Sequence, residues 1–150
     1  MTKMHVRLAI LALAGLGAPV AFAQPNDSCS TPDAIAGFGT FAFDTSAATT
    51  STVGLACGQG DAFNDVWYCW TASQGGPVTV SLCLGDVFHD SLIAVYTGCG
   101  CPVGNDEITC NDDFCGLQST LSFSAQTGQT YMIRVGGYSE GLVGAGSIGI

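Results

Sequence analysis

Cationic side chains are nearly absent from this sequence. It has 3 Lys and Arg residues against 12 Asp and Glu residues, and beyond residue 23 Arg134 is the only cation, which leaves that part with a net charge of −11. Nucleic-acid binding depends on Lys and Arg side chains that displace counterions from phosphates. The composition therefore excludes nucleic acid as a partner and disfavours anionic membrane surfaces. We expect Arg134 to pair with an Asp or Glu on a neighbouring strand.

Histidine is equally scarce, which argues against an enzyme. Beyond residue 23 the only histidine is His89, which we expect to lie in a solvent-exposed loop, and sequence adjacency to Asp90 does not orient it for catalysis. The sequence has no Gly-x-Ser-x-Gly elbow and no His-Glu-x-x-His motif. A glycosidase with two catalytic carboxylates stays open by counting alone, but nothing assigns a raised pKa to one of them. We therefore predict no catalytic residues.

Residues 1–23 are predicted to be a signal peptide. Lys3 and Arg7 precede an apolar run that begins at Leu8, and Ala21-Phe22-Ala23 forms a cleavage signature. The run is shorter than the about 20 continuous apolar residues of a membrane-spanning helix, and glycines and a proline interrupt it. We therefore expect export, cleavage after Ala23, and a single secreted or surface domain over residues 24–150.

The cysteines support the same compartment. All eight lie beyond residue 23, and an even number in an exported chain predicts disulfides. Zinc is the alternative, since Cys99-Gly100-Cys101 and the pair Cys110 and Cys115 loosely suggest ligand pairs, but structural zinc sites use a different spacing. The cysteines are Cys29, Cys57, Cys69, Cys83, Cys99, Cys101, Cys110 and Cys115.

Apolar residues recur with the period of β-strands, and no long window keeps a helical period. A short helical turn near Thr31 to Ile35 is predicted, with Thr31 as its N-cap. Residues 92–96 are apolar throughout, which indicates a strand that is covered on both faces. With turn formers between the strands, the pattern predicts an all-β, antiparallel β-sandwich or jelly roll stapled by disulfides. The predicted strands are residues 40–44, 66–71, 78–82, 92–96, 121–125, 131–135 and 147–150.

Residues 98–116 are predicted to form an irregular loop that is rich in cysteine and in acidic residues. Calcium takes oxygen ligands from carboxylates, Asn side chains and backbone carbonyls. Asn111, Asp112 and Asp113 offer three such side chains, and Asp90 stands at the start of a strand that could run beside them. Because clustered carboxylates repel unless a cation offsets them, these four residues are the candidate calcium ligands, and calcium is the only candidate cofactor. The alternative is that they are turn formers.

Several aromatic residues could form a platform for sugars if they emerge on one exposed face. Alternation within the predicted strands places Tyr68, Trp70 and Tyr131 in the core, since that is the default for strand aromatics. Trp67 faces opposite to Trp70 and is the candidate for exposure, as is Tyr138 in a glycine-rich turn.

A series of short motifs resembles the bacterial pre-peptidase C-terminal domains of secreted proteins. The resemblance implies a non-catalytic β-sandwich appended to exported enzymes or repeated in surface proteins, with roles in secretion, attachment or adhesion. The sequence departs from the family where His89 separates Phe88 from Asp90, and where Cys69 and Cys101 stand in addition to the usual six cysteines. The matching motifs are Asn26-Asp27-Ser28-Cys29, Asp65-Val66-Trp67-Tyr68, Asp90-Ser91-Leu92, Val95-Tyr96-Thr97-Gly98, Cys110-Asn111-Asp112-Asp113 and Gly128-Gln129-Thr130-Tyr131.

Spacing alone does not choose among the many disulfide pairings that eight cysteines allow. We expect Cys110–Cys115 to close a short loop and Cys29–Cys57 to tie the N-terminal segment to the body. We further expect Cys83–Cys99 to join the ends of two strands, and the two additional cysteines, Cys69 and Cys101, to form a mutual bridge.

Taken with the resemblance, these features predict a non-catalytic extracellular module for attachment, secretion or surface assembly, stabilised by calcium. Its partner would be an extracellular protein or a polysaccharide. Two alternatives stay open: a repeat unit of a cell-envelope or adhesive protein, and an accessory domain of a secreted hydrolase whose catalytic part lies outside this chain.

Overall fold

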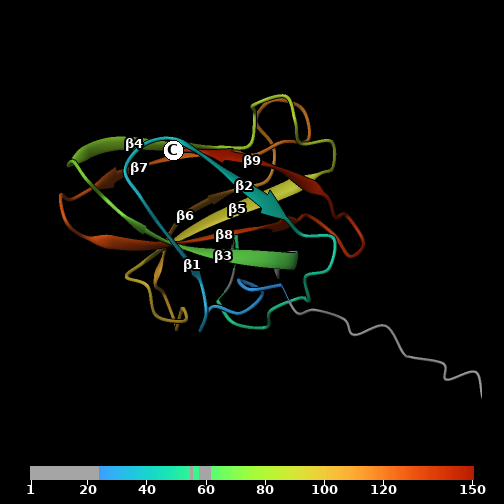
Figure 1. Cartoon of the computed structure of the whole chain (residues 1–150), viewed down its shortest axis with the longest axis horizontal. Coiled ribbons are helices and arrows are strands. Elements are labelled where there is room, and N and C mark those ends of the chain that lie inside the picture. Colours follow the sequence, from blue (N-terminus) through green and yellow to red (C-terminus); the bar gives the residue numbers. More distant parts are fainter. Residues whose placement is uncertain (1–23, 55, 58–61) are drawn as a thin grey trace, which may run out of the picture.

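The computed structural model describes residues 24–54, 56–57 and 62–150 (Figure 1). The predicted signal peptide, residues 1–23, lies outside the described residues. Within the described ranges the secondary structure is entirely β. The strands are β1 (Asp33–Ala36), β2 (Thr40–Asp44), β3 (Phe63–Thr71), β4 (Gly76–Ser81), β5 (Ser91–Thr97), β6 (Glu107–Asn111), β7 (Thr120–Ala125), β8 (Thr130–Gly137) and β9 (Ala145–Gly149).

The strands form two sheets that pack face to face. One sheet has five strands in the order β1-β3-β8-β5-β6, and the other has four in the order β2-β9-β4-β7. In Figure 1 the two sheets lie one above the other. The predicted β-sandwich is confirmed. It is antiparallel except at one edge, where β1 runs parallel to β3. None of the residues that the structure describes belongs to a helix long and apolar enough to cross a membrane.

Two strands were not predicted from the sequence, and both lie at the edges of the five-stranded sheet. β6 crosses the segment that was predicted to be irregular, where pairing with β5 makes a strand of mostly polar residues. β1 begins at Asp33, so the predicted helical turn near Thr31 is wrong. In both cases pairing with a neighbouring strand overrides a weak local signal.

Aromatic rings fill the space between the two sheets. Trp70 of β3 and Tyr131 of β8 are buried with their ring centroids 5.9 Å apart. Phe123 of β7 closes the cluster from the opposite sheet, 5.0 Å from the ring of Tyr131. The predicted burial of Tyr68, Trp70 and Tyr131 is confirmed.

The outer face of the five-stranded sheet is also buried. A second apolar cluster on this face includes Trp67, Tyr96 and Met132, and all three residues are buried. The predicted exposure of Trp67 is therefore wrong. The segment between β2 and β3 covers the Trp67 ring, and the indole Nε1 of Trp67 donates to Ser51 Oγ of that segment at 3.1 Å. The prediction that residues 92–96 are covered on both faces is confirmed.

All four expected disulfide pairings are wrong. Cys110 lies within β6, where its side chain meets the covering segment rather than the nearby Cys115. Two bridges fasten neighbouring segments to strands of the five-stranded sheet, one at Cys110 of β6 and one at Cys69 of β3. A third joins the segment before β1 to the loop between β5 and β6, and the fourth joins the loop after β4 to the loop that precedes β7. All eight cysteines are in disulfides, which leaves none for zinc. The pairs are Cys29–Cys101, Cys57–Cys110, Cys69–Cys99 and Cys83–Cys115.

Candidate functional site

Three loops meet at one end of the sandwich: residues 82–90 between β4 and β5, 112–119 between β6 and β7, and 138–144 between β8 and β9. The register explains their meeting. Ser91, the first residue of β5, pairs with Gly137, the last residue of β8, and Ser81 at the end of β4 pairs with Thr120 at the start of β7. We call this region the loop end.

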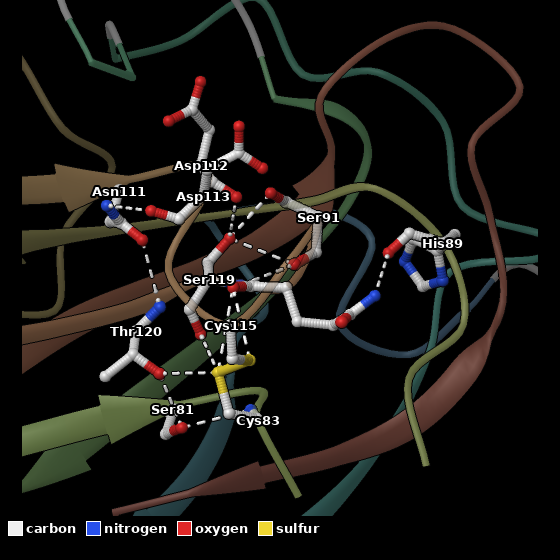
Figure 2. The surroundings of a disulfide bond; sticks show 11 residues. Ser81, Cys83, His89, Ser91, Asn111, Asp112, Asp113, Cys115, Ser119 and Thr120 are labelled. Carbon is white, nitrogen blue, oxygen red and sulfur yellow. Dashed lines mark hydrogen bonds between the residues drawn. A yellow bond between two sulfur atoms is a disulfide. The ribbon is translucent and has the colours of Figure 1, made fainter. Parts of the chain in front are cut away.

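Covalent and hydrogen bonds connect these loops (Figure 2). The disulfide Cys83–Cys115 joins the first loop to the second, and the amide Nε2 of Gln118 donates to His89 O at 3.4 Å. The backbone N–H of Tyr138 donates to Asp90 O at 3.1 Å, which ties the third loop to the first. The loop end is therefore a connected unit rather than three independent loops.

Two buried serines hold this unit to the sheet. Ser119 Oγ lies 2.6 Å from Ser91 O and 2.9 Å from Asp112 O, and the backbone N–H of Ser119 donates to Ser91 Oγ at 3.1 Å. Figure 2 shows the pair at the centre of the loop end. Because both hydroxyls are buried and bonded to the protein itself, we interpret them as positioning groups rather than nucleophiles.

Large apolar side chains are exposed on these loops. Phe88 is 88% exposed and Phe114 is 71% exposed, each next to a residue that links two loops. We call these two, with the three other exposed apolar residues of the same loops, the loop-end surface. The predicted exposure of Tyr138 is confirmed, whereas sequence reasoning missed the rest. The loop-end surface consists of Leu84, Phe88, Phe114, Leu117 and Tyr138.

The four residues predicted to bind calcium also lie at the loop end. Burial raises the pKa of Asp90, and the negative charges of Asp113 and Asp112 raise it further. The charges of Asp112 and Asp113 therefore repel the ionised carboxylate of Asp90. The amide of Asn111 is occupied within the loop, because its Oδ1 accepts from Thr120 N at 3.1 Å and its Nδ2 donates to Asp113 O at 3.2 Å. That use matches the alternative of a turn-forming residue.

The carboxylates do not converge on a ready-made metal centre. Among residues 24–54, 56–57 and 62–150, no group of three His, Cys, Asp or Glu side chains is placed to hold a metal ion. Calcium binding through Asp90, Asn111, Asp112 and Asp113 stays a prediction.

His89 is half-buried rather than solvent-exposed as predicted. Its ring packs edge-on against Phe43, with 6.3 Å between the centroids, and lies against Gly144 of the third loop. Burial lowers the pKa of the imidazole, and the neighbouring Asp90 opposes that shift. The ring thus acts as a packing element between the loop end and the core.

Arg134 is removed from the surface completely. As predicted, it pairs with a carboxylate on a neighbouring strand: its Nε lies 3.1 Å from Oδ2 of Asp65 on β3, and both side chains are fully buried. Its guanidinium lies 4.9 Å from the centroid of the Trp67 ring. Because no other Lys or Arg occurs beyond residue 23, residues 24–150 present no arginine or lysine to solvent.

A two-sheet sandwich with four disulfides and connected loops at one end defines a module of the extracellular β-sandwich class. Residues 25–145 match a T9SS-associated family described as "Galactose binding domain-like", and the chain belongs to that family. The match and the disulfides indicate a secreted or cell-surface protein. None of the curated proteins matches the chain. The family differs from the pre-peptidase C-terminal domains, so that resemblance is not confirmed, although both are bacterial secreted-protein domains.

Proposed function

We propose that this chain is a non-catalytic extracellular module that attaches to another macromolecule through the loop-end surface. The observation that carries the proposal is the exposure of five large apolar side chains on loops that a disulfide and hydrogen bonds connect. Large apolar side chains exposed on adjoining loops are a feature of interaction sites. Loops held in place by a rigid scaffold lose less conformational entropy on binding.

The non-catalytic part of the proposal draws on the family and on the chemistry at the loop end. The family description names a binding domain. The hydroxyls of Ser91 and Ser119 are bonded internally, and His89 is held in packing contacts. These residues therefore support the architecture of a binding surface. Attachment, secretion and surface assembly all use such a surface, as would an accessory domain of a secreted hydrolase.

A galactose-containing glycan is the second candidate ligand, which the family description favours. Carboxylates such as Asp112 and Asp113 accept hydrogen bonds from sugar hydroxyls, and Phe88 and Phe114 offer ring faces for the apolar side of a sugar. This candidate uses the same surface, so one set of variants tests both.

The test measures retention of oxidised residues 24–150 on agarose, which is a galactose polymer, and on beads coated with a basic amphipathic peptide. The test variant is Phe88→Ser/Phe114→Ser. The control is Phe38→Ser/Val103→Ser, which removes two other exposed apolar side chains outside the three loops. Retention on either matrix that the test variant loses and the control keeps supports attachment through the loop-end surface. Retention on neither, or equal loss in both variants, overturns it.

A further inference from the structure

We propose that the partner of the loop-end surface is a basic protein segment, in which lysine or arginine side chains accompany apolar ones. This inference rests on the proposed function, because it names the chemistry of the partner that the same surface takes.

The first argument is the charge around the apolar side chains. The same three loops carry only negative charge, and residues 24–150 offer no exposed lysine or arginine to balance it, since Arg134 is buried with Asp65. Electrostatic complementarity across an interface therefore requires cations from the partner. The carboxylates of the three loops are those of Asp86, Asp90, Asp112, Asp113 and Glu140.

The second argument is that this negative charge is not relieved within the molecule. Asp112 and Asp113 are consecutive in the second loop, which the disulfide Cys83–Cys115 joins to the loop that ends at Asp90. The amide of Asn111, which could donate to a carboxylate side chain, donates to a backbone carbonyl instead. A cationic partner that comes between these carboxylates would replace repulsion by attraction.

The third argument concerns the kind of molecule that brings the cations. Four of the five side chains of the loop-end surface are Leu or Phe, which have no polar atom to meet a sugar hydroxyl. Such side chains are buried at the centre of protein interfaces, with charged groups at the rim. Phe88 and Phe114 also present ring faces to which Lys or Arg can add a cation–π contact. The combination favours a basic protein segment over a glycan.

The inference is tested with three labelled synthetic peptides: one of alternating Lys and Leu, one of alternating Glu and Leu, and one of Lys alone. Their affinities for oxidised residues 24–150 are measured by fluorescence anisotropy at low and moderate salt. We expect the Lys–Leu peptide to bind, more weakly as salt rises. We expect the Glu–Leu peptide not to bind, and the all-Lys peptide to bind at least about tenfold more weakly because it lacks apolar side chains.

Matched variants locate the binding. Asp112→Asn/Asp113→Asn and Phe88→Ser/Phe114→Ser should each weaken binding of the Lys–Leu peptide by about tenfold. Asp33→Asn/Asp106→Asn removes the same charge outside the three loops and should leave the affinity within about twofold of the parent.

Three outcomes overturn the inference: no binding of the Lys–Leu peptide, equal binding of the Glu–Leu peptide, or equal loss in the two charge variants. Retention on agarose without binding of the Lys–Leu peptide would leave the proposed function standing while this inference fails. Circular dichroism and thermal melts of each variant confirm that the fold is intact before affinities are compared.

Discussion

Arg134 of β8 and Asp65 of β3 form an ion pair in which neither side chain reaches solvent, with 3.1 Å between Nε and Oδ2. The guanidinium also donates to the backbone carbonyls of Ser51 at 2.8 Å and of Ala62 at 3.0 Å. A single cation thus contacts the segment between β2 and β3 at two places, at Ser51 and at Ala62 next to the start of β3. Because Arg134 is the only Lys or Arg beyond residue 23, its burial leaves the surface of residues 24–150 without an arginine or lysine side chain.

Replacing the arginine should destabilise the fold strongly. Arg134→Met leaves the buried carboxyl group of Asp65 without its ion-pair partner, for which we expect a loss of about 3–5 kcal/mol in the free energy of unfolding. Urea unfolding of oxidised residues 24–150 measures it. The double variant Arg134→Met/Asp65→Leu should recover part of the loss, because it removes the orphaned charge. A loss below about 1 kcal/mol in Arg134→Met would contradict the assigned role.

The disulfide pairing has a direct check. Proteolysis without reduction, followed by mass spectrometry, should recover peptides that join Cys29 to Cys101 and Cys57 to Cys110. Cys57→Ser/Cys110→Ser should lower the free energy of unfolding by about 2–4 kcal/mol, since the unfolded chain gains freedom when a long loop is opened. Cys57→Ser alone serves as a comparison in which Cys110 is left free. Recovery of a peptide that joins Cys110 to Cys115 would disprove the pairing.

The hydrophobic pattern of the sequence predicted most of the strands and the side chains that fill the space between the sheets. Alternation along β3, β7 and β8 identified the side chains that pack between the two sheets, and the unbroken apolar run of β5 indicated a strand covered on both faces. Trp67 was misplaced because alternation tells which residues share a face but not what covers that face. The disulfides were mispaired because cysteine partners are chosen by the spatial order of strands, which a linear sequence does not reveal.

The sequence likewise identified some residues of the loop end and missed others. Acidic residues in a cysteine-rich loop drew attention to Asp112 and Asp113, and a glycine-rich turn identified Tyr138. Phe88 and Phe114 carried a weaker signal, which is a large apolar residue within a segment of turn formers. The loops that carry them are joined by the disulfide Cys83–Cys115, whose pairing the sequence did not indicate. Because the Cys83–Cys115 pairing was not predicted, the connection between the two loops at the site was not predicted either.

The calcium prediction is tested by a thermal melt. If the carboxylates of Asp90, Asp112 and Asp113 take up calcium in the folded state only, millimolar calcium should raise the melting temperature relative to EDTA, in a saturable way. Asp112→Ala and Asp113→Ala should abolish the shift, whereas Asp33→Ala should not. Magnesium at equal concentration controls for general screening of charge. Overlapping melts in calcium and EDTA would remove calcium from the description of the loop end.

His89 should make stability depend on pH. Burial lowers its pKa below the ordinary value of 6.5, so the unfolded chain binds its proton more readily than the folded protein does. The contribution of His89 to stability is then fully present above about pH 6.5 and is lost as the pH falls toward the folded pKa.

Urea unfolding between about pH 5 and about pH 8 should show this loss in the parent and a smaller one in His89→Gln. The effect of Asp90 on the pH dependence of stability has the opposite sign. Burial and the negative charges of Asp113 and Asp112 raise its pKa above 3.8, so its ionised form destabilises the folded protein, and Asp90→Asn should stabilise the protein most at neutral pH. Since the ordinary pKa values of the two groups differ widely, the two variants separate their effects. Parallel pH profiles for the parent and His89→Gln would show that the imidazole does not couple protonation to packing at the loop end.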